Sequence, residues 1–378
     1  MIRGAGSAPP SYPHGPMAQT RGFQLGRQFA RWAPLASTAL LWPTGPRGPR
    51  SRGIRRCSAE ELRTPFPEIE ARKTGNLVTV DGTHSLYYEV SGNPKGKVVL
   101  FLHGGPGDGS SPKHRRLFDP EVFCIVAFDQ RGAGQSVGKK EFNTTEKLVQ
   151  DIEQLRLHLG VESWELLVGG SWGSTLALAY STRFPARVKA MVLYSIFIPS
   201  QASIEFPYSA AGAGLFFPEA HEAFAAAVDA TGAQPGELLG RYAERLASED
   251  TKVRNAARSA YLRWIMRLLS LEPDESIIEE VARNPEDAGD GLAIEMRYMA
   301  NGCFVDADQL LEECKRIAHL PCAIVHGRND LLCPPANAWR LRQRLPRAKL
   351  IFVPQAGHSS SLAPALRSEI LKAIDGHR

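Results

Sequence analysis

A serine flanked by glycines is the residue of this sequence best suited to act as a nucleophile. The segment GGSWG fits the pattern G-x-S-x-G, with Gly169 and Gly173 around Ser171, and it joins a strand-like run to a helix-like run. Such a turn strains the serine backbone, so the residues two positions away must be small. Ser171 then lies at a helix N-terminus, where free amides and the dipole favour negative charge. The alternative is a glycine-rich connection with an incidental serine.

Two later segments supply the base and the acid that a serine nucleophile requires. VHGRNDLLCP places Asp330 just after an apolar strand-like run, and IFVPQAGHSS places His358 just after the next. The nucleophile turn predicts the chain order serine, acid, histidine. Asp330 would orient His358, which takes the Ser171 proton and returns it to the leaving group. Singly, the aspartate is typical of a turn and the histidine of a solvated loop; together and in this order they predict a catalytic triad.

Two backbone amides are expected to stabilise the oxyanion. One is that of Trp172, directly after the nucleophile. The other comes from the loop HGGPG (103–107), where glycine allows close backbone approach. We expect the Gly105 amide here, with Gly104 as the second choice.

Other polar residues at strand ends are expected to be structural. His103 and His326 each precede a glycine in an HG turn, and we expect both to bond backbone groups. Asp129 precedes Ser171 in the chain, which is the wrong order for the acid, so we expect it to shape its loop. No H-E-x-x-H segment and no G-x-G-x-x-G fingerprint with its acidic ribose partner occurs, so we expect neither metal nor nucleotide cofactor.

Strand and helix patterns alternate along the chain, which predicts an α/β fold with a mostly parallel sheet covered by helices on both faces. An antiparallel pair is expected first, around the turn DGTH (81–84). The segment 143–160 has a helical apolar stripe that Asn143 can cap and Gly160 can end. Residues from about 200 to 317 are Ala-rich and show no strand pattern, and they are too many for a loop. We therefore expect a core of 64–198 and 318–378, with an inserted helical cap at 199–317.

Residues 1–57 differ in composition from the rest. They hold nine arginines, no lysine and no carboxylate, as in an organellar transit peptide, with plastid import favoured over mitochondrial. The alternatives are a disordered tail and a mispredicted start codon. Beyond residue 57 the chain has 36 Lys plus Arg against 40 Asp plus Glu, so its net charge is −4 and no nucleic-acid footprint remains. No apolar run approaches the roughly 20 residues that cross a bilayer, so we expect a cytoplasmic or organellar protein.

The cysteines indicate a reducing compartment. Six occur, none in a C-x-x-C pair, and an odd number follows the leader, so we expect buried thiols and no disulfide framework. Cys333 lies three residues after Asp330, either lining a pocket or filling the core.

Five segments together resemble the proline iminopeptidases, prolyl aminopeptidases of the α/β-hydrolase fold. They are FLHGGPG, FDQRGAGQS, GGSWGSTLALAY, VHGRNDLLCP and PQAGHS, and the resemblance runs from about residue 64 to the C-terminus. It implies a metal-independent serine peptidase that releases an N-terminal proline from a small peptide with a free N-terminus. It implies the same triad, Ser171, Asp330 and His358, and leaves the oligomeric state open.

The resemblance also implies a substrate site in the cap and shows where this chain departs from the family. Glu295 matches a carboxylate that binds the substrate's amino group, and Trp264 and Phe197 match further substrate-binding positions. A second family glutamate is replaced by Ile265, and Tyr261 stands for a tryptophan. Losing one charged hydrogen bond costs roughly 1.5–3 kcal/mol. We therefore expect weakened or altered proline selectivity, unless another cap carboxylate compensates.

Two other functions stay open from the sequence. One is an esterase or amidase of the same fold whose cap no longer recognises an amine. The other is a catalytically silent binding protein, which the intact triad and oxyanion loop argue against. Epoxide and haloalkane hydrolysis is disfavoured because it requires a carboxylate at position 171.

Overall fold

A computed structural model describes residues 62–138 and 142–378, so the arginine-rich leader lies outside the described residues. These residues form a nine-stranded sheet in the order β1-β2-β4-β3-β6-β7-β8-β9, with β5 paired to β2. The strands are β1 (Lys73–Val78), β2 (His84–Gly92), β3 (Lys97–Leu102), β4 (Phe123–Phe128), β5 (Val137–Gly138), β6 (Leu166–Gly170), β7 (Met191–Tyr194), β8 (Cys322–Gly327) and β9 (Lys349–Val353). β2 is antiparallel to β1 and β4, whereas β4, β3 and β6 to β9 run parallel.

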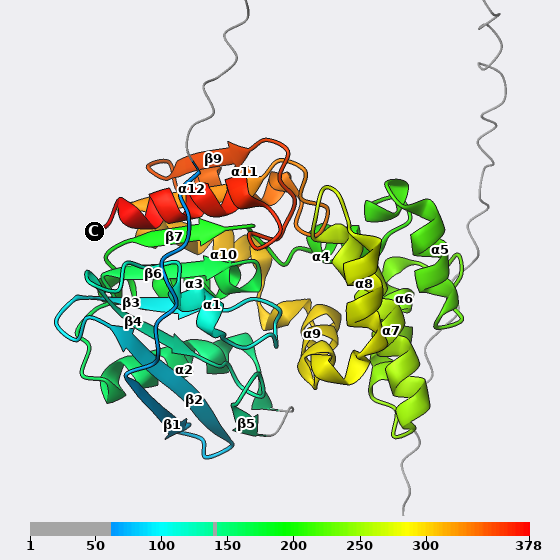
Figure 1. Cartoon of the computed structure of the whole chain (residues 1–378), viewed down its shortest axis with the longest axis horizontal. Helices are drawn as coiled ribbons and strands as arrows, with labels where there is room; N and C mark the ends of the chain where they lie inside the picture. The colour runs from blue at the N-terminus through cyan, green and yellow to red at the C-terminus, as the bar shows by residue number, and fades with distance from the viewer. Residues whose placement is uncertain (1–61, 139–141) are drawn as a thin grey trace, which may run out of the picture. The chain divides into compact units, whose positions relative to one another are not determined.

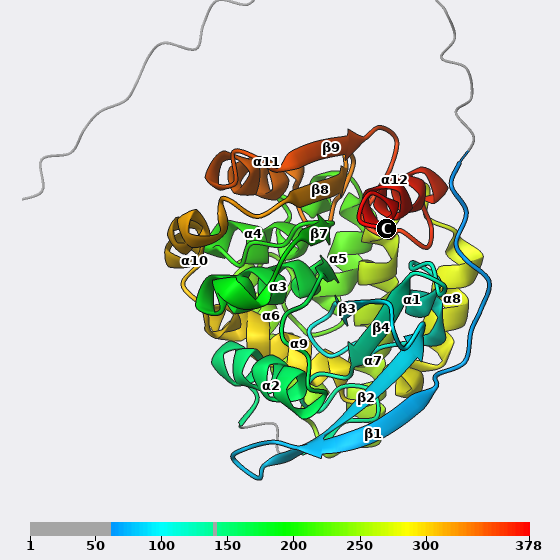
Figure 2. The ribbon, with the colours of Figure 1, turned by 90° about the vertical axis from the view of Figure 1, so that its left-hand side faces the viewer.

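Helices cover both faces of the sheet. The helices are α1 (Pro112–Arg115), α2 (Thr145–His158), α3 (Trp172–Arg183), α4 (Gln201–Glu205), α5 (Pro218–Ala226), α6 (Pro235–Leu246), α7 (Thr251–Leu268), α8 (Glu275–Arg283), α9 (Gly291–Ala300), α10 (Ala307–Glu313), α11 (Pro335–Arg344) and α12 (Pro364–Asp375). Figure 2 shows α2, α3, α10 and α11 on one side and α1 and α12 on the other. Successive side chains of a strand point to opposite faces of the sheet, and in β3 both faces are buried. Leu100 and Leu102 belong to one buried apolar cluster, and Val99 and Phe101 belong to the other. The predicted fold class is confirmed.

The insertion between β7 and β8 is helical, as predicted. Helices α5 to α8 pack on one another beside the sheet, and α9 lies between them and the core (Figure 1). Helix α10 lies in the segment predicted as cap, yet it packs against α3 and α11 alongside the sheet. The helices that stand apart from the sheet are therefore α5 to α9.

The start of α2 differs from the prediction that Asn143 caps it. Thr144 is the N-cap, and its hydroxyl accepts from the Lys147 amide at 3.5 Å. The Asn143 side chain instead donates to the Arg131 carbonyl at 2.7 Å and accepts from the Tyr298 hydroxyl at 2.7 Å. Two adjacent residues able to cap compete at such a boundary, and here the tertiary bonds of Asn143 decide between them.

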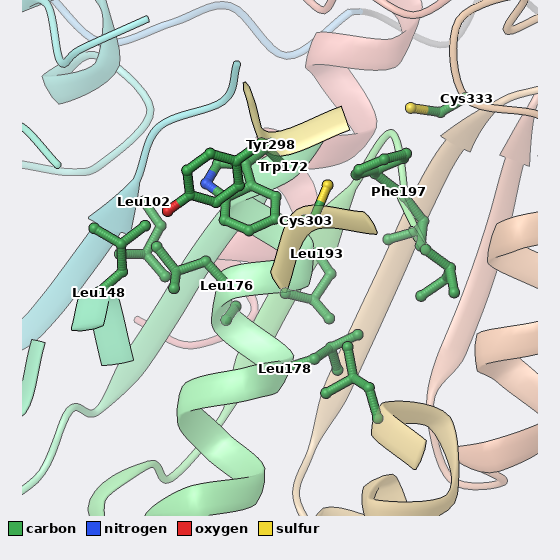
Figure 3. Packing of buried hydrophobic residues seen from close by; sticks show 14 of the residues in the cluster. Leu102, Leu148, Trp172, Leu176, Leu178, Leu193, Phe197, Tyr298, Cys303 and Cys333 are labelled. Atoms are coloured by element: carbon green, nitrogen blue, oxygen red, sulfur yellow. The ribbon is translucent and has the colours of Figure 1, made fainter. Parts of the chain in front are cut away.

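Tyr298 also packs on the core beneath the nucleophile turn. Its ring meets that of Trp172 edge to face, with centroids 5.0 Å apart (Figure 3). The Trp172 indole N–H donates to the Gln130 side chain at 2.8 Å. Cap helix α9, which carries Tyr298, is thereby fixed to the element that begins at the nucleophile.

No helix among the described residues is long and apolar enough to span a membrane.

Candidate active site

Ser171 occupies a strained turn between β6 and α3. Its φ of 53° and ψ of −127° lie in a region that residues with side chains rarely adopt. A methyl group on Gly169 would lie 2.3 Å from the Gly173 carbonyl oxygen, and one on Gly173 would lie 2.2 Å from the Leu102 carbonyl oxygen. Both glycines are therefore required by contact between backbones, which is the reason that the sequence pattern indicated for them.

Asp330 and His358 form a buried pair beyond the ends of β8 and β9. His358 Nδ1 lies 2.8 Å from Asp330 Oδ2, and the other carboxylate oxygen accepts from the Leu332 and Cys333 amides at 3.0 and 2.8 Å. Burial alone would raise the pKa of Asp330, but the facing imidazole and the Cys333 amide bring it below its usual value. Burial disfavours the His358 cation, yet the Asp330 charge holds the His358 pKa well above 6.5.

Backbone contacts fix the loop that carries His358. The Ser195 hydroxyl donates to the His358 carbonyl at 2.8 Å. The amide of Ser359 donates to the Leu269 carbonyl at 2.9 Å, just beyond cap helix α7. The position of the imidazole therefore depends on both the core and the cap.

Cys333 stands beside the nucleophile and the base. Burial raises the pKa of its thiol, while hydrogen-bonding contacts with His358 and Ser171 act in the opposite direction. Among the described residues no hydrogen bond joins the Ser171 hydroxyl directly to His358. Catalytic hydrogen bonds are often loose without substrate, and a rotation about the Ser171 Cα–Cβ bond changes the partner of the hydroxyl.

The predicted oxyanion donors flank Ser171. The Trp172 amide is the first N–H of α3, so it has no acceptor within that helix. Gly105 lines the same pocket as Ser171 and has a φ of 99°, which glycine adopts without strain.

His103 and Asp129 hold the loops around this turn. His103 Nε2 accepts from the Gln130 amide at 2.9 Å, which leaves Nδ1–H to donate to the Gly104 carbonyl at 2.9 Å. Asp129 accepts from the Ser110 amide and hydroxyl at 2.6 and 2.5 Å. Both residues bond neighbouring loops, as expected of structural groups.

His326 also bonds backbone groups. Its Nδ1 accepts from the Ile196 amide at 2.8 Å, and its Nε2–H donates to the Cys333 carbonyl at 2.9 Å. Burial lowers the His326 pKa, so the ring is neutral and ties β8 to the segment after β7.

A small pocket opens above Ser171. Core and cap both line it, with Gly105, Ser171, Phe197, Ser203, Ile204, Pro207, Tyr208, Glu295, Met299, Leu332 and Cys333. The wall is largely apolar and carries one carboxylate, that of Glu295. The arrangement suits a small apolar residue with one positively charged group.

Two tyrosines hold the Glu295 carboxylate. The Tyr261 hydroxyl donates to Glu295 Oε1 at 2.8 Å, and the hydroxyls of Tyr208 and Tyr261 are 2.8 Å apart. Burial raises the pKa of Glu295 to about 8, although the tyrosine hydroxyls act in the opposite direction. No Lys or Arg pairs with this carboxylate within residues 62–138 and 142–378.

Of the other two residues predicted to bind substrate, Phe197 lies at the pocket and Trp264 does not. Phe197 lines the pocket. Trp264 is buried in the cap, where its indole N–H donates to the Pro207 carbonyl at 2.9 Å and its ring stacks on Phe224. It therefore supports the pocket wall through Pro207. Ile265 packs on the apolar cluster of the cap and is not among the pocket-lining residues of the described chain.

Comparisons with known proteins identify the family of this chain. Residues 97–363 match the family model described as the alpha/beta hydrolase fold. A probable proline iminopeptidase of Leptolyngbya boryana is 42% identical over 318 residues, which cover 83% of this chain and 97% of that protein. The proline iminopeptidase of Arabidopsis thaliana is 42% identical over 82% of this chain and 81% of its own. The chain belongs to the proline iminopeptidase family.

A solved structure agrees with the fold. The proline iminopeptidase-related protein of Thermus thermophilus has a TM-score of 0.54 at 24% identity, and the match covers 81% of this chain and 99% of that one. At this identity the likeness supports the α/β-hydrolase fold alone.

Some residues at the site of this proline iminopeptidase family member have no sequence signal of their own. Tyr208 lies in a short 3-10 helix, η3 (Phe206–Tyr208), and meets Glu295 only through folding of the cap. Tyr261 was noted as a departure from the family, yet its hydroxyl holds the expected carboxylate. Asp108 lies just beyond the glycines predicted to supply an oxyanion amide, and a methyl group on Gly104 would lie 3.2 Å from its Oδ2 and 3.6 Å from Ser171 Cβ.

Proposed function

We propose that this chain is a serine aminopeptidase that hydrolyses the bond after an N-terminal proline. The buried His358–Asp330 pair, set beside the strained Ser171 turn, is the observation that carries this proposal. Membership of the proline iminopeptidase family supplies the substrate class. The proposal is supported by the apolar pocket with one carboxylate that Ser171 and Gly105 line, and by Trp172, which follows Ser171 directly at the start of α3.

The reaction follows from the places of these groups. His358 takes the Ser171 proton as the oxygen attacks the prolyl carbonyl, and the amides of Trp172 and Gly105 bind the oxyanion. The imidazolium, stabilised by Asp330, then protonates the leaving amine. A water activated by His358 hydrolyses the acyl-enzyme and releases proline.

Glu295 and Phe197 select the substrate in this proposal. The Glu295 carboxylate binds the N-terminal ammonium, and the apolar wall beside Phe197 holds the pyrrolidine ring. The segments α4, η3 and α9 of the insertion line the pocket around the N-terminal residue.

One substrate series tests the proposal. Prolyl, alanyl and N-acetylprolyl arylamides are compared with 4-nitrophenyl acetate, which has no amine, using wild type and Ser171→Ala. We expect cleavage of the prolyl arylamide, little of its acetylated form, and loss of both activities in Ser171→Ala. Equal cleavage of blocked and free arylamides, or ester cleavage alone, would refute the aminopeptidase assignment.

We also propose that residues 1–57 act as a plastid import signal. Nine arginines without a carboxylate support this. A fusion of residues 1–57 to a fluorescent protein should enter plastids in plant cells, and a version with these arginines changed to glutamine should stay outside. Mitochondrial or diffuse signal from the unaltered fusion would contradict it.

A further inference from the structure

Two glycines bring the oxyanion loop against cap helix α9. A methyl group on Gly107 would lie 2.6 Å from the Gly291 carbonyl oxygen, and one on Gly291 would lie 2.7 Å from the Gly107 carbonyl oxygen. Neither position has room for a side chain, so the two backbones are in direct contact. Asp108 follows Gly107, and Glu295 lies one turn beyond Gly291 on the same side of α9.

The Asp108 carboxylate lies beside the nucleophile. A methyl group on Gly104 would be 3.2 Å from Asp108 Oδ2 and 3.6 Å from Ser171 Cβ. The Asp108 carboxylate and the Ser171 side chain therefore both lie next to Gly104. Asp108 is exposed to solvent as a residue, while its carboxylate packs among protein atoms beside the nucleophile.

No Lys or Arg of the described chain neutralises this carboxylate. Asp108 forms no hydrogen bond or ion pair with a described residue, and Glu295 is bonded by tyrosine hydroxyls. Burial of the carboxylate raises the pKa of Asp108, although the imidazoles of His103 and His358 act in the opposite direction. The charge of Asp108 in turn helps to raise the Glu295 pKa. Two carboxylates next to a nucleophile, without a Lys or Arg partner, form a place for a cation brought by the substrate.

We propose that Asp108 binds the N-terminal ammonium of the substrate together with Glu295 and so determines specificity for a free N-terminus. This inference rests on the aminopeptidase function proposed above. It also answers the question raised by Ile265, because the compensating carboxylate comes from the oxyanion loop and not from the cap.

The geometry of the substrate fits this arrangement. In an N-terminal residue the nitrogen is about 2.5 Å from the carbonyl carbon, through the N–Cα and Cα–C bonds. The carbonyl carbon must approach the Ser171 oxygen to about 3–3.5 Å before attack. The ammonium is thus confined to the immediate surroundings of Ser171, where Asp108 Oδ2 lies.

The charge of Asp108 also acts against substrates without an amine. An unpaired carboxylate near the oxyanion donors repels the oxyanion that develops on the substrate. A substrate ammonium between the carboxylate and the oxyanion removes that repulsion. Asp108 therefore favours amines and disfavours blocked substrates through the same interaction.

Asp108→Asn tests the proposal, because it keeps the shape of the side chain and removes its charge. We expect kcat/KM for the prolyl arylamide to fall about 10- to 150-fold, the value of one charged hydrogen bond, mainly through KM. The rate with 4-nitrophenyl acetate should stay unchanged or rise. Asp108→Glu should retain most of the preference for the free amine. Glu219→Gln, an exposed carboxylate on α5, is the matched control and should leave both rates unchanged.

Three outcomes would overturn the proposal: an Asp108→Asn enzyme with unchanged kcat/KM for the prolyl arylamide, an equal loss for both substrates, or a loss in kcat alone. Thermal unfolding of each variant identifies misfolding, and Asp108→Gly supplies a second neutral variant in that case. These results are distinct from failure of the function itself, which would appear as a wild-type enzyme without a free-amine requirement.

Discussion

Replacing Glu295 by glutamine tests the amine site with little change in shape. The new amide side chain keeps a carbonyl oxygen that can accept from Tyr261, as Glu295 Oε1 does at 2.8 Å. What disappears is the negative charge. The loss of one charged hydrogen bond is about 1.5–3 kcal/mol, so kcat/KM for a prolyl arylamide should fall about 10- to 150-fold. The rate with 4-nitrophenyl acetate should stay within about twofold of wild type, because the triad keeps its bonds.

The pH dependence gives this prediction a second readout. Burial raises the pKa of Glu295 to about 8, so at pH 7 most of this carboxylate is protonated and cannot pair with an ammonium. Ionisation of His358 affects both substrates, and it cancels in the ratio of arylamide to ester kcat/KM. That ratio should rise with pH between about 6 and 8 in wild type as Glu295 ionises, and fall again above about 8 as the substrate ammonium, with an ordinary pKa of about 7.7–8.0, loses its proton. The rise on the acid side should be absent in Glu295→Gln.

The assay is a pair of progress curves at each pH from about 6 to 9.5, a range that brackets the raised pKa, with Glu219→Gln as the control. Equal losses on arylamide and ester would show that Glu295 supports the catalytic groups instead of the amine. An unchanged arylamide rate, or a ratio in the variant that still rises between about pH 6 and 8, would refute the assignment of the carboxylate.

Two further predictions concern the nucleophile turn and the base. Gly173→Ala should lower the free energy of unfolding in urea by about 1–3 kcal/mol, because the added methyl group would lie 2.2 Å from the Leu102 carbonyl oxygen. Gly240→Ala is the control: it adds a methyl group in open space on α6 and should raise the free energy of unfolding by about 0.5–1 kcal/mol. Similar stability changes in the two variants would contradict the steric argument. Because neutral His358 is the base and its pKa is raised, ester hydrolysis should fall with decreasing pH at a midpoint above 6.5, and Asp330→Asn should lower both that midpoint and the rate. An unmoved midpoint would exclude Asp330 as its cause.

Local backbone requirements explain why much of this site was predictable. A methyl group on Gly169 or Gly173 would lie only 2.2–2.3 Å from a backbone carbonyl oxygen around one turn, and this restriction leaves a pattern in nearby residues of the sequence. The strands were predictable because both faces of the sheet are buried, which makes each strand a continuous apolar run. Asp330 and His358 could be paired because both follow consecutive strands that lie side by side.

The substrate site was less predictable because its residues meet only through packing of the cap. Tyr208, Tyr261 and Glu295 lie on three separate helices, and no spacing along the chain relates them. Trp264 was equally hard to predict. Its place in the family pattern suggested contact with the substrate, whereas its indole N–H donates to the Pro207 carbonyl. In amphipathic cap helices the residue type indicates burial and does not indicate whether the buried face meets core or ligand.

The position of Asp108 adds a physical link between catalysis and specificity. The oxyanion loop must approach the substrate carbonyl closely, so any charged side chain on it acts on the transition state as well as on the bound substrate. A carboxylate there is unfavourable for every acyl substrate except one that carries a cation beside the carbonyl. A carboxylate on a distant cap helix improves amine binding without that penalty for other substrates. If Asp108 has the role proposed here, exclusion of blocked substrates arises in the catalytic loop itself.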